Sequence, residues 1–260
     1  MKMPVIFVGH GSPMIAISHD EHTEELKKVG DYVLKTYGKP KAILMISGHW
    51  YQNEFYIQTD EHPKQIYDMY GFPKELYEVK YEVEGYRPLS DAVMKRMTDK
   101  LVSVNNEWGI DHGTWSVLVH MFPKADIPVV QLSVNARLSP EGSYKLGALL
   151  SDLREEGYLI MGSGNVVHNL RQVDWENPKG NYMSDGFDDY IKEAILNRED
   201  DKVINYKDHK YAAYAVPTPD HFLPLIYMLG ASQGDSAKVF NNYRELGSMA
   251  MTSYLFESKE

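Results

Sequence analysis

The strongest constraint on the fold is a repeated order of short apolar runs, small turns and helical patterns. The runs at 5–8, 42–46 and 158–161 have the length of strands, and each passes into a turn of glycine, serine or histidine. A charged amphipathic helix is predicted over about 21–37. Strands that alternate with helices favour a parallel sheet covered by helices on both faces. We therefore expect an α/β fold, with a single domain over residues 1–260 built on a central, mainly parallel sheet flanked by helices.

A fourth strand is predicted over 128–134, followed by a helix with clear end signals. Ser139 is a good N-cap residue and Pro140 suits the first helical position. Gly157 suits the residue just after a helix C-terminus, so this helix is expected to end near it.

Three histidines lie in or soon after the turns that follow predicted strands. His10 and His49 stand directly beyond the runs at 5–8 and 42–46, and His168 follows the run at 158–161 by a few residues. Open parallel sheets bind ligands at the carboxyl ends of their strands. The topology therefore predicts an active site at this edge, although a tight-loop histidine can also serve only to bond backbone carbonyls.

Composition restricts the chemistry of such a site. The chain has no cysteine, which excludes disulfides, iron–sulfur clusters, thiolate zinc sites and cysteine nucleophiles, so a metal would need His, Asp or Glu ligands. A net charge of −10 disfavours nucleic acid as a partner. The longest apolar runs have strand length, and the N-terminal segment lacks a long apolar signal region. We expect a cytoplasmic protein that acts on a small molecule and has no membrane partner.

Two further histidines lie near predicted helix starts. Asp111 and His112 precede an apolar helical run, and either Asp111 caps that helix beside an exposed His112 or His112 is functional. Thr218 and Pro219 are predicted as N-cap and first helical residue, which would place His221 in the first turn, facing a metal or solvent. The remaining histidines lie in charged or helical surroundings and are predicted to be solvated or structural: His19, His22, His62, His120 and His209.

At this point the sequence resembles a known family, the class III extradiol ring-cleavage dioxygenases, and in particular their 4,5-DOPA dioxygenase-like branch. The resemblance extends over nearly the whole chain and rests on the joint order of these fragments: Gly9-His10-Gly11-Ser12-Pro13, Ser47-Gly48-His49-Trp50, Tyr70-Gly71-Phe72-Pro73, Asp111-His112-Gly113-Thr114-Trp115, Pro128-Val129-Val130-Gln131-Leu132-Ser133, Gly162-Ser163-Gly164-Asn165-Val166-Val167-His168-Asn169-Leu170 and Pro217-Thr218-Pro219-Asp220-His221.

The resemblance implies a role for each of the five histidines. His10, His49 and His221 would bind one divalent metal, which is Fe(II) for catalysis, with Zn(II) also suited to an all-imidazole set. His168 would be the acid/base residue facing substrate and O2, with a fourth-ligand role as the alternative. His112 would be a second active-site histidine that orients substrate or oxygen. The family implies a catechol as substrate, cleaved next to its diol, and assembly as a homodimer or larger oligomer.

Other readings of the same residues remain open at this stage. A zinc hydrolase could use the same histidines to activate water, and a metal-binding module would use them without catalysis. Trp50, Phe72 and Trp115 are candidates for aromatic walls around a substrate, with core packing as the alternative for Trp50 and the more expected role for Trp115.

Overall fold

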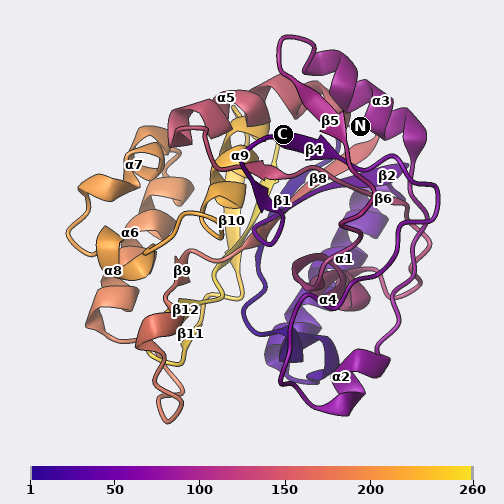
Figure 1. Ribbon diagram of the computed structural model, residues 1–260. Helices are drawn as coiled ribbons and strands as arrows, with labels where there is room; N and C mark the ends of the chain where they lie inside the picture. Colours follow the sequence, from indigo (N-terminus) through magenta and orange to yellow (C-terminus); the bar gives the residue numbers. More distant parts are fainter. Residues whose placement is uncertain (1, 259–260) are drawn as a thin grey trace.

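A six-stranded sheet runs through the centre of the molecule, for which a computed structural model describes residues 2–258 (Figure 1). The outermost residues of the predicted 1–260 domain therefore lie outside the described part of the chain. The strand order is β10-β13-β1-β8-β2-β6. Its strands are β1 (Val5–Gly9), β2 (Ala42–Ser47), β6 (Val129–Gln131), β8 (Tyr158–Gly164), β10 (Ser236–Phe240) and β13 (Ser253–Glu257).

Four neighbouring strands of this sheet are parallel. β8 pairs in parallel with both β1 and β2, and β2 pairs in parallel with β6. The last strand of the chain, β13, is antiparallel to β1 on one side and to β10 on the other. The predicted α/β class with a mainly parallel central sheet is thus confirmed, with an antiparallel pair added at one edge.

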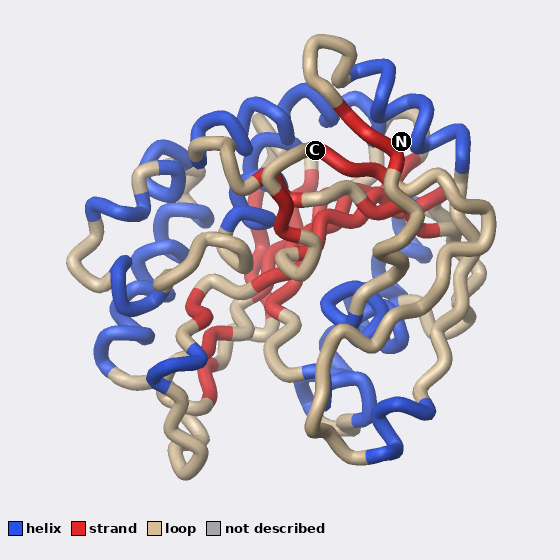
Figure 2. Tube along the Cα trace, in the orientation of Figure 1, coloured by secondary structure: helices blue, strands red, loops and turns tan. Residues whose placement is uncertain are grey.

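Helices cover both faces of the sheet (Figure 2). The larger ones are α1 (Glu21–Tyr37), α3 (Arg87–Arg96), α4 (His112–Met121), α5 (Pro140–Leu150), α6 (Tyr182–Leu196) and α9 (Leu223–Ala231). Alternation along each strand sends successive side chains to opposite faces. In β2, Leu44 enters the core shared with α5 and α9, whereas Ile43 and Met45 enter the core shared with α1 and α4.

Shorter elements surround this core. They are α2 (Lys74–Glu78), α7 (Asp200–Ile204), α8 (Ala212–Ala215), the 3-10 turns η1 (Pro13–Ile17), η2 (Ser151–Arg154), η3 (Leu170–Gln172) and η4 (Tyr206–Asp208), and the strands β3 (Tyr51–Gln52), β4 (Phe55–Ile57), β5 (Val102–Val104), β7 (Val134–Asn135), β9 (Val167–His168), β11 (Arg244–Glu245) and β12 (Met249–Ala250). The order β11-β12-β9 makes a small second sheet, and this sheet carries His168.

Element boundaries agree with the sequence in some places and depart from it in others. The helix predicted over 21–37 has these bounds, and Ser139 caps α5 by accepting from the N–H of Gly142 at 3.0 Å. The α-helical part of α5 ends at Leu150, and only a 3-10 turn continues towards Gly157, which has a φ of 90°. The strand predicted over 128–134 is divided into β6 and β7, because the chain turns aside after Gln131 to pair beside β3. Within residues 2–258, no helix combines the length and apolar character needed to cross a membrane.

Candidate metal centre

Five histidines from distant parts of the chain meet at one end of the parallel strands. His10 and His49 follow β1 and β2, His112 begins α4, His168 ends β9, and His221 lies just before α9. The ring centroids of His10, His49 and His221 are 4.8–5.1 Å apart in all three pairs. His112 lies 3.9 Å from His49, and His168 stacks on His221 at 3.8 Å with an angle of 4° between the planes. All the candidate site residues taken from the sequence are therefore gathered in one cluster.

Three of these rings point the same nitrogen inwards. The Nε2 atoms of His10 and His49 are 3.0 Å apart, and those of His49 and His221 are 3.3 Å apart. The outward Nδ1 of His49 lies 3.2 Å from Asp68 Oδ2, and that of His221 contacts Asp220 Oδ2. A carboxylate only accepts hydrogen bonds, so both Nδ1 atoms carry a proton, and in the neutral ring, the form that binds a metal, each Nε2 presents a lone pair.

In His10 the position of the ring proton is fixed by a serine instead of a carboxylate. Its Nδ1 lies 2.8 Å from Ser163 Oγ, and the single hydroxyl proton of Ser163 is donated to the carbonyl of Gly113. Ser163 can therefore only accept from His10, which leaves the His10 Nε2 unprotonated. Three lone pairs then converge on one point, an arrangement that is repulsive unless a cation lies between them. The donor set fits a divalent metal held by imidazoles.

Burial and neighbouring charges set the protonation of the cluster. Burial, aided by the adjacent histidines, holds the pKa of His10 well below its ordinary value and lowers the pKa of His221. Burial also lowers the pKa of His168, to about 3. For His49 burial acts in the same direction, but the hydrogen bond to Asp68 and the nearby carboxylates raise its pKa overall. The rings of His10, His168 and His221 are thus neutral near pH 7, as metal ligands and proton acceptors need to be.

Close backbone packing positions these side chains. A Cβ added to Gly164, the last residue of β8, would lie 2.0 Å from the carbonyl oxygen of His221. A Cβ on Gly113 would lie 2.7 Å from the ring of His49. Glycine at both positions lets a strand end and a helix start approach the histidines more closely than any other residue would permit.

The sequence-based placement of His221 in a first helical turn is wrong. The N–H groups of Phe222 and Leu223 both bond to the carbonyl of Pro219, which closes a turn, and α9 begins only at Leu223. Pro224 has no N–H to donate to the carbonyl of residue 220, so the series of helical hydrogen bonds is interrupted between this turn and α9. His221 therefore lies in the turn itself, 6% exposed.

At the other helix start, Asp111 does cap α4, yet His112 is buried rather than exposed. Asp111 Oδ1 accepts from the N–H of Thr114 at 3.1 Å, and the carboxylate also bonds Ser47, Trp108 and Gln131. His112 is 5% exposed. Capping by Asp111, which the sequence presented as one of two alternatives, thus occurs beside a buried His112 that belongs to the histidine cluster.

Of the predicted aromatic walls, two are core residues. Trp50 and Trp115 are 1% and 0% exposed, and Trp50 stacks on Trp108 at 6.3 Å. Phe72 is half-buried against the core on the α1 and α4 side. The five other histidines lie outside the cluster. Among them, His62 pairs with Glu84 at the surface, and His120 is half-buried, bonded to a carbonyl of η1.

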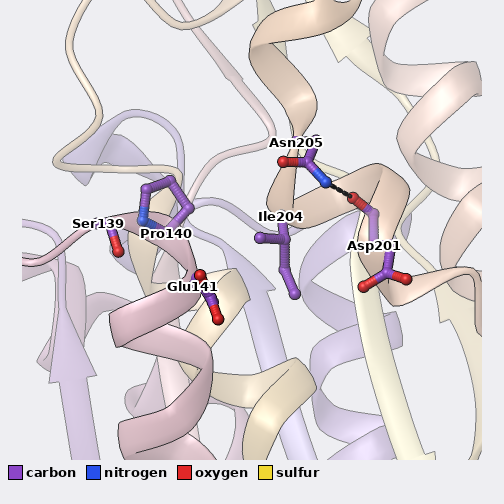
Figure 3. Close-up of a pocket in the computed structure, with 6 residues that line it drawn as sticks. All are labelled: Ser139, Pro140, Glu141, Asp201, Ile204 and Asn205. Carbon is purple, nitrogen blue, oxygen red and sulfur yellow. Dashed lines mark hydrogen bonds between the residues drawn. The ribbon is translucent and has the colours of Figure 1, made fainter.

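Three residues that contact the cluster were not singled out by their position in the sequence. Asp220 directly precedes His221, and Ser163 lies between the glycines at the end of β8. These neighbours in the sequence could have marked both residues as candidates. Asp68 lies in an irregular segment between β4 and α2, where no local pattern marks it. A hollow of about 320 Å³ elsewhere is lined by residues of α5 and α7 and their flanks and contains no histidine (Figure 3): Ser139, Pro140, Glu141, Asp201, Ile204 and Asn205.

Comparison with known proteins adds to this geometry. Residues 4–257 match the family described as the catalytic LigB subunit of aromatic ring-opening dioxygenase. A protein of Escherichia coli K12 named 4,5-DOPA dioxygenase extradiol is 36% identical over 97% of this chain and 94% of its own length. A protein of Beta vulgaris with the same name is 34% identical over 97% of this chain and 96% of its own. The crystal structure of an uncharacterised E. coli K12 protein superposes with a TM-score of 0.85 at 32% identity, covering 98% of this chain and all of the other.

Proposed function

Because the chain belongs to the LigB family of aromatic ring-opening dioxygenases and is an extradiol ring-cleavage enzyme, we propose that its substrate is a catechol, cleaved next to the diol with O2. The curated relatives carry 4,5-DOPA in their names, which favours a catechol with a DOPA-like side chain. The observation that carries the proposal is the convergence of three Nε2 lone pairs, at 3.0 and 3.3 Å, beside two further histidines. Such a cluster can hold a metal and still leave imidazoles free for proton transfer.

We assign metal binding to His10, His49 and His221. Many non-haem iron sites use two histidines and one carboxylate, whereas here the third position is an imidazole. Asp68 and Asp220 bring negative charge to the outer nitrogens of two of the three rings, which increases the basicity of the inner nitrogens and partly offsets the charge of the metal. Fe(II) supplies the redox capacity that a reaction with O2 requires, and Zn(II), which fits the same ligands, has no redox chemistry.

His168 is proposed as the acid/base residue. Its ring stacks on His221 and is half-buried at the end of β9, so it lies beside the metal-binding group. A neutral imidazole can take a proton from a substrate hydroxyl and return it later in the reaction. His112, next to His49, is proposed to orient the substrate or oxygen.

Oxygen uptake tests the proposed reaction. The protein is loaded with Fe(II) without oxygen and then mixed with air-saturated buffer and a panel of catechols, including one with an amino-acid side chain and one without. We expect one O2 consumed per catechol, a yellow semialdehyde product, and both atoms of labelled oxygen in that product. The zinc-loaded protein should consume no oxygen. Absence of oxygen uptake across the panel, from protein shown to contain Fe(II), would refute the proposal.

Two histidine variants separate the assigned roles. His168→Ala should abolish turnover while most of the metal remains bound, and loss of the metal instead would make His168 a ligand. His62→Ala is the matched control, because this side chain is 78% exposed and lies outside the cluster. It should keep both metal and turnover. A zinc hydrolase would instead need turnover of an ester or amide with zinc alone, which a ring-opening dioxygenase family does not favour.

A further inference from the structure

We infer that Asp68 is a positioning residue that fixes two active-site histidines at once, a candidate metal ligand and the second active-site histidine. Its carboxylate lies between His49 and His112. Oδ2 is 3.2 Å from the Nδ1 of His49, and Oδ1 is 3.0 Å from the Nδ1 of His112. Oδ1 also accepts the backbone N–H of His112 at 2.8 Å. This inference rests on the proposed function only for the roles that it assigns to His49 and His112.

The ionised carboxylate of Asp68 can only accept hydrogen bonds. Both contacts run from an imidazole Nδ1 to an ionised oxygen, so both rings must carry the proton on Nδ1. Each Nε2 is then unprotonated and points away from Asp68. In His49 that nitrogen faces the Nε2 atoms of His10 and His221, and in His112 it is left as an acceptor.

Asp68 is held in place both by the contacts of its side chain and by backbone hydrogen bonds of its loop. The side chain is 13% exposed, and its two oxygens bond two imidazoles and one backbone N–H. The N–H of Ile66 bonds to the carbonyl of Ile110 at 2.9 Å, and Trp115 Nε1 bonds to the carbonyl of Ile66 at 2.9 Å. The loop is thereby tied to the start of α4, two residues away from Asp68.

Asp68 differs from the other carboxylates of the site. Asp220 contacts one ring, that of His221. Asp111 is committed to capping α4 and to polar side chains, and does not bond an imidazole. Among these three carboxylates, only Asp68 bonds two rings. A change at Asp68 should therefore alter two histidines, whereas a change at Asp220 should alter one.

Asp68→Ala, Asp68→Asn, Asp68→Glu and Asp220→Asn are compared, with Asp60→Asn as the matched control on an exposed residue of the same loop. Zn²⁺ affinity is measured by competition with a coloured chelator, so that no turnover is needed. We expect binding 10- to 100-fold weaker in Asp68→Asn, which is the usual effect of losing the partner of a ligating histidine, and unchanged binding in Asp60→Asn. Asp68→Glu keeps the carboxylate and should recover part of the affinity.

The decisive readout is the tautomer of His112, obtained from ¹⁵N-histidine NMR of the zinc-loaded proteins. Wild type, Asp220→Asn and Asp68→Glu should show the proton of His112 on Nδ1. In Asp68→Ala no acceptor faces the Nδ1 of His112, so this ring should also populate the form with the proton on Nε2. A role confined to holding the loop would lower stability without moving this signal.

Two results would overturn the inference. One is a wild-type His112 that carries its proton on Nε2, and the other is an Asp68→Ala variant with wild-type Zn²⁺ affinity and an unchanged His112 tautomer. Both are read without a dioxygenase assay. If the metal and tautomer results are as expected but the iron-loaded wild type opens no catechol, the proposed function fails and the role of Asp68 stands.

Discussion

Gly164→Ala should damage the metal centre without touching any of its side chains. The added Cβ would lie 2.0 Å from the carbonyl oxygen of His221, and that carbonyl must move back by about 1.4 Å to reach an ordinary contact of 3.4 Å. The same carbonyl accepts the N–H of Asn165 at 2.9 Å, so the movement also strains a buried hydrogen bond. Misplacement of a reacting group by about 1 Å can cost about 10²-fold in rate, and overpacking costs about 1–3 kcal/mol in stability.

The assay combines Zn²⁺ affinity, turnover of the iron-loaded protein and urea unfolding. We expect at least tenfold weaker metal binding, a rate about 100-fold lower, and a free energy of unfolding lower by about 1–3 kcal/mol. Gly142→Ala is the control, since it lies in the first turn of α5 and its new Cβ would meet the flexible end of Leu138 at 3.3 Å and the Oγ of Ser139 at 3.4 Å. That variant should keep activity and gain up to about 1 kcal/mol. A Gly164→Ala protein with wild-type metal affinity and turnover would refute the argument that this backbone contact sets the position of His221.

Three further predictions concern stability. Arg154→Met should lower the free energy of unfolding by about 3–5 kcal/mol in a urea titration, because Arg154 is fully buried and its loss leaves Asp235 without its main partner. Burial raises the pKa of Asp188 to about 6, against the opposing effect of Arg244. A folded pKa above the unfolded value near 3.9 gives stability that is present below about pH 4 and lost as the pH rises through 6, so wild type should lose about 2 kcal/mol relative to Asp188→Asn between pH 4 and pH 7. Finally, Zn²⁺ at 100 times its dissociation constant should add about 2.7 kcal/mol to the free energy of unfolding, and a chelator should reverse this gain in wild type but have no effect in His221→Ala.

The sequence predicted the parts of this molecule that depend on local pattern and on simple topology. Apolar runs ending in small residues located β1, β2 and β8, and parallel pairing then put His10 and His49 at the same edge. The capping residues Ser139 and Asp111 were also recognisable, because their hydrogen bonds join residues only three apart.

What the sequence could not provide depends on contacts between distant segments. Asp68 reaches His112 across 44 positions of the chain, and its own neighbours form no regular element. In the sequence, the turn around His221 resembles the start of a helix, because Pro219 suits a turn and a first helical position equally. The two are distinguished by Pro224 and by the packing of Gly164 against the turn. Such contacts are set by tertiary packing, which no short pattern encodes.

The position of β1 in the sheet also has a consequence for the order in which the chain can fold. Its two neighbours, β8 and β13, begin about 150 and 250 residues further along the chain. During synthesis the strand that leads to His10 therefore waits with both edges unpaired, and contacts of such long range are slow to form. All five residues of β1 are buried in the folded protein, so during that interval their exposed apolar side chains favour aggregation. The histidine cluster can therefore be completed only after the segment that carries His221 has been synthesised.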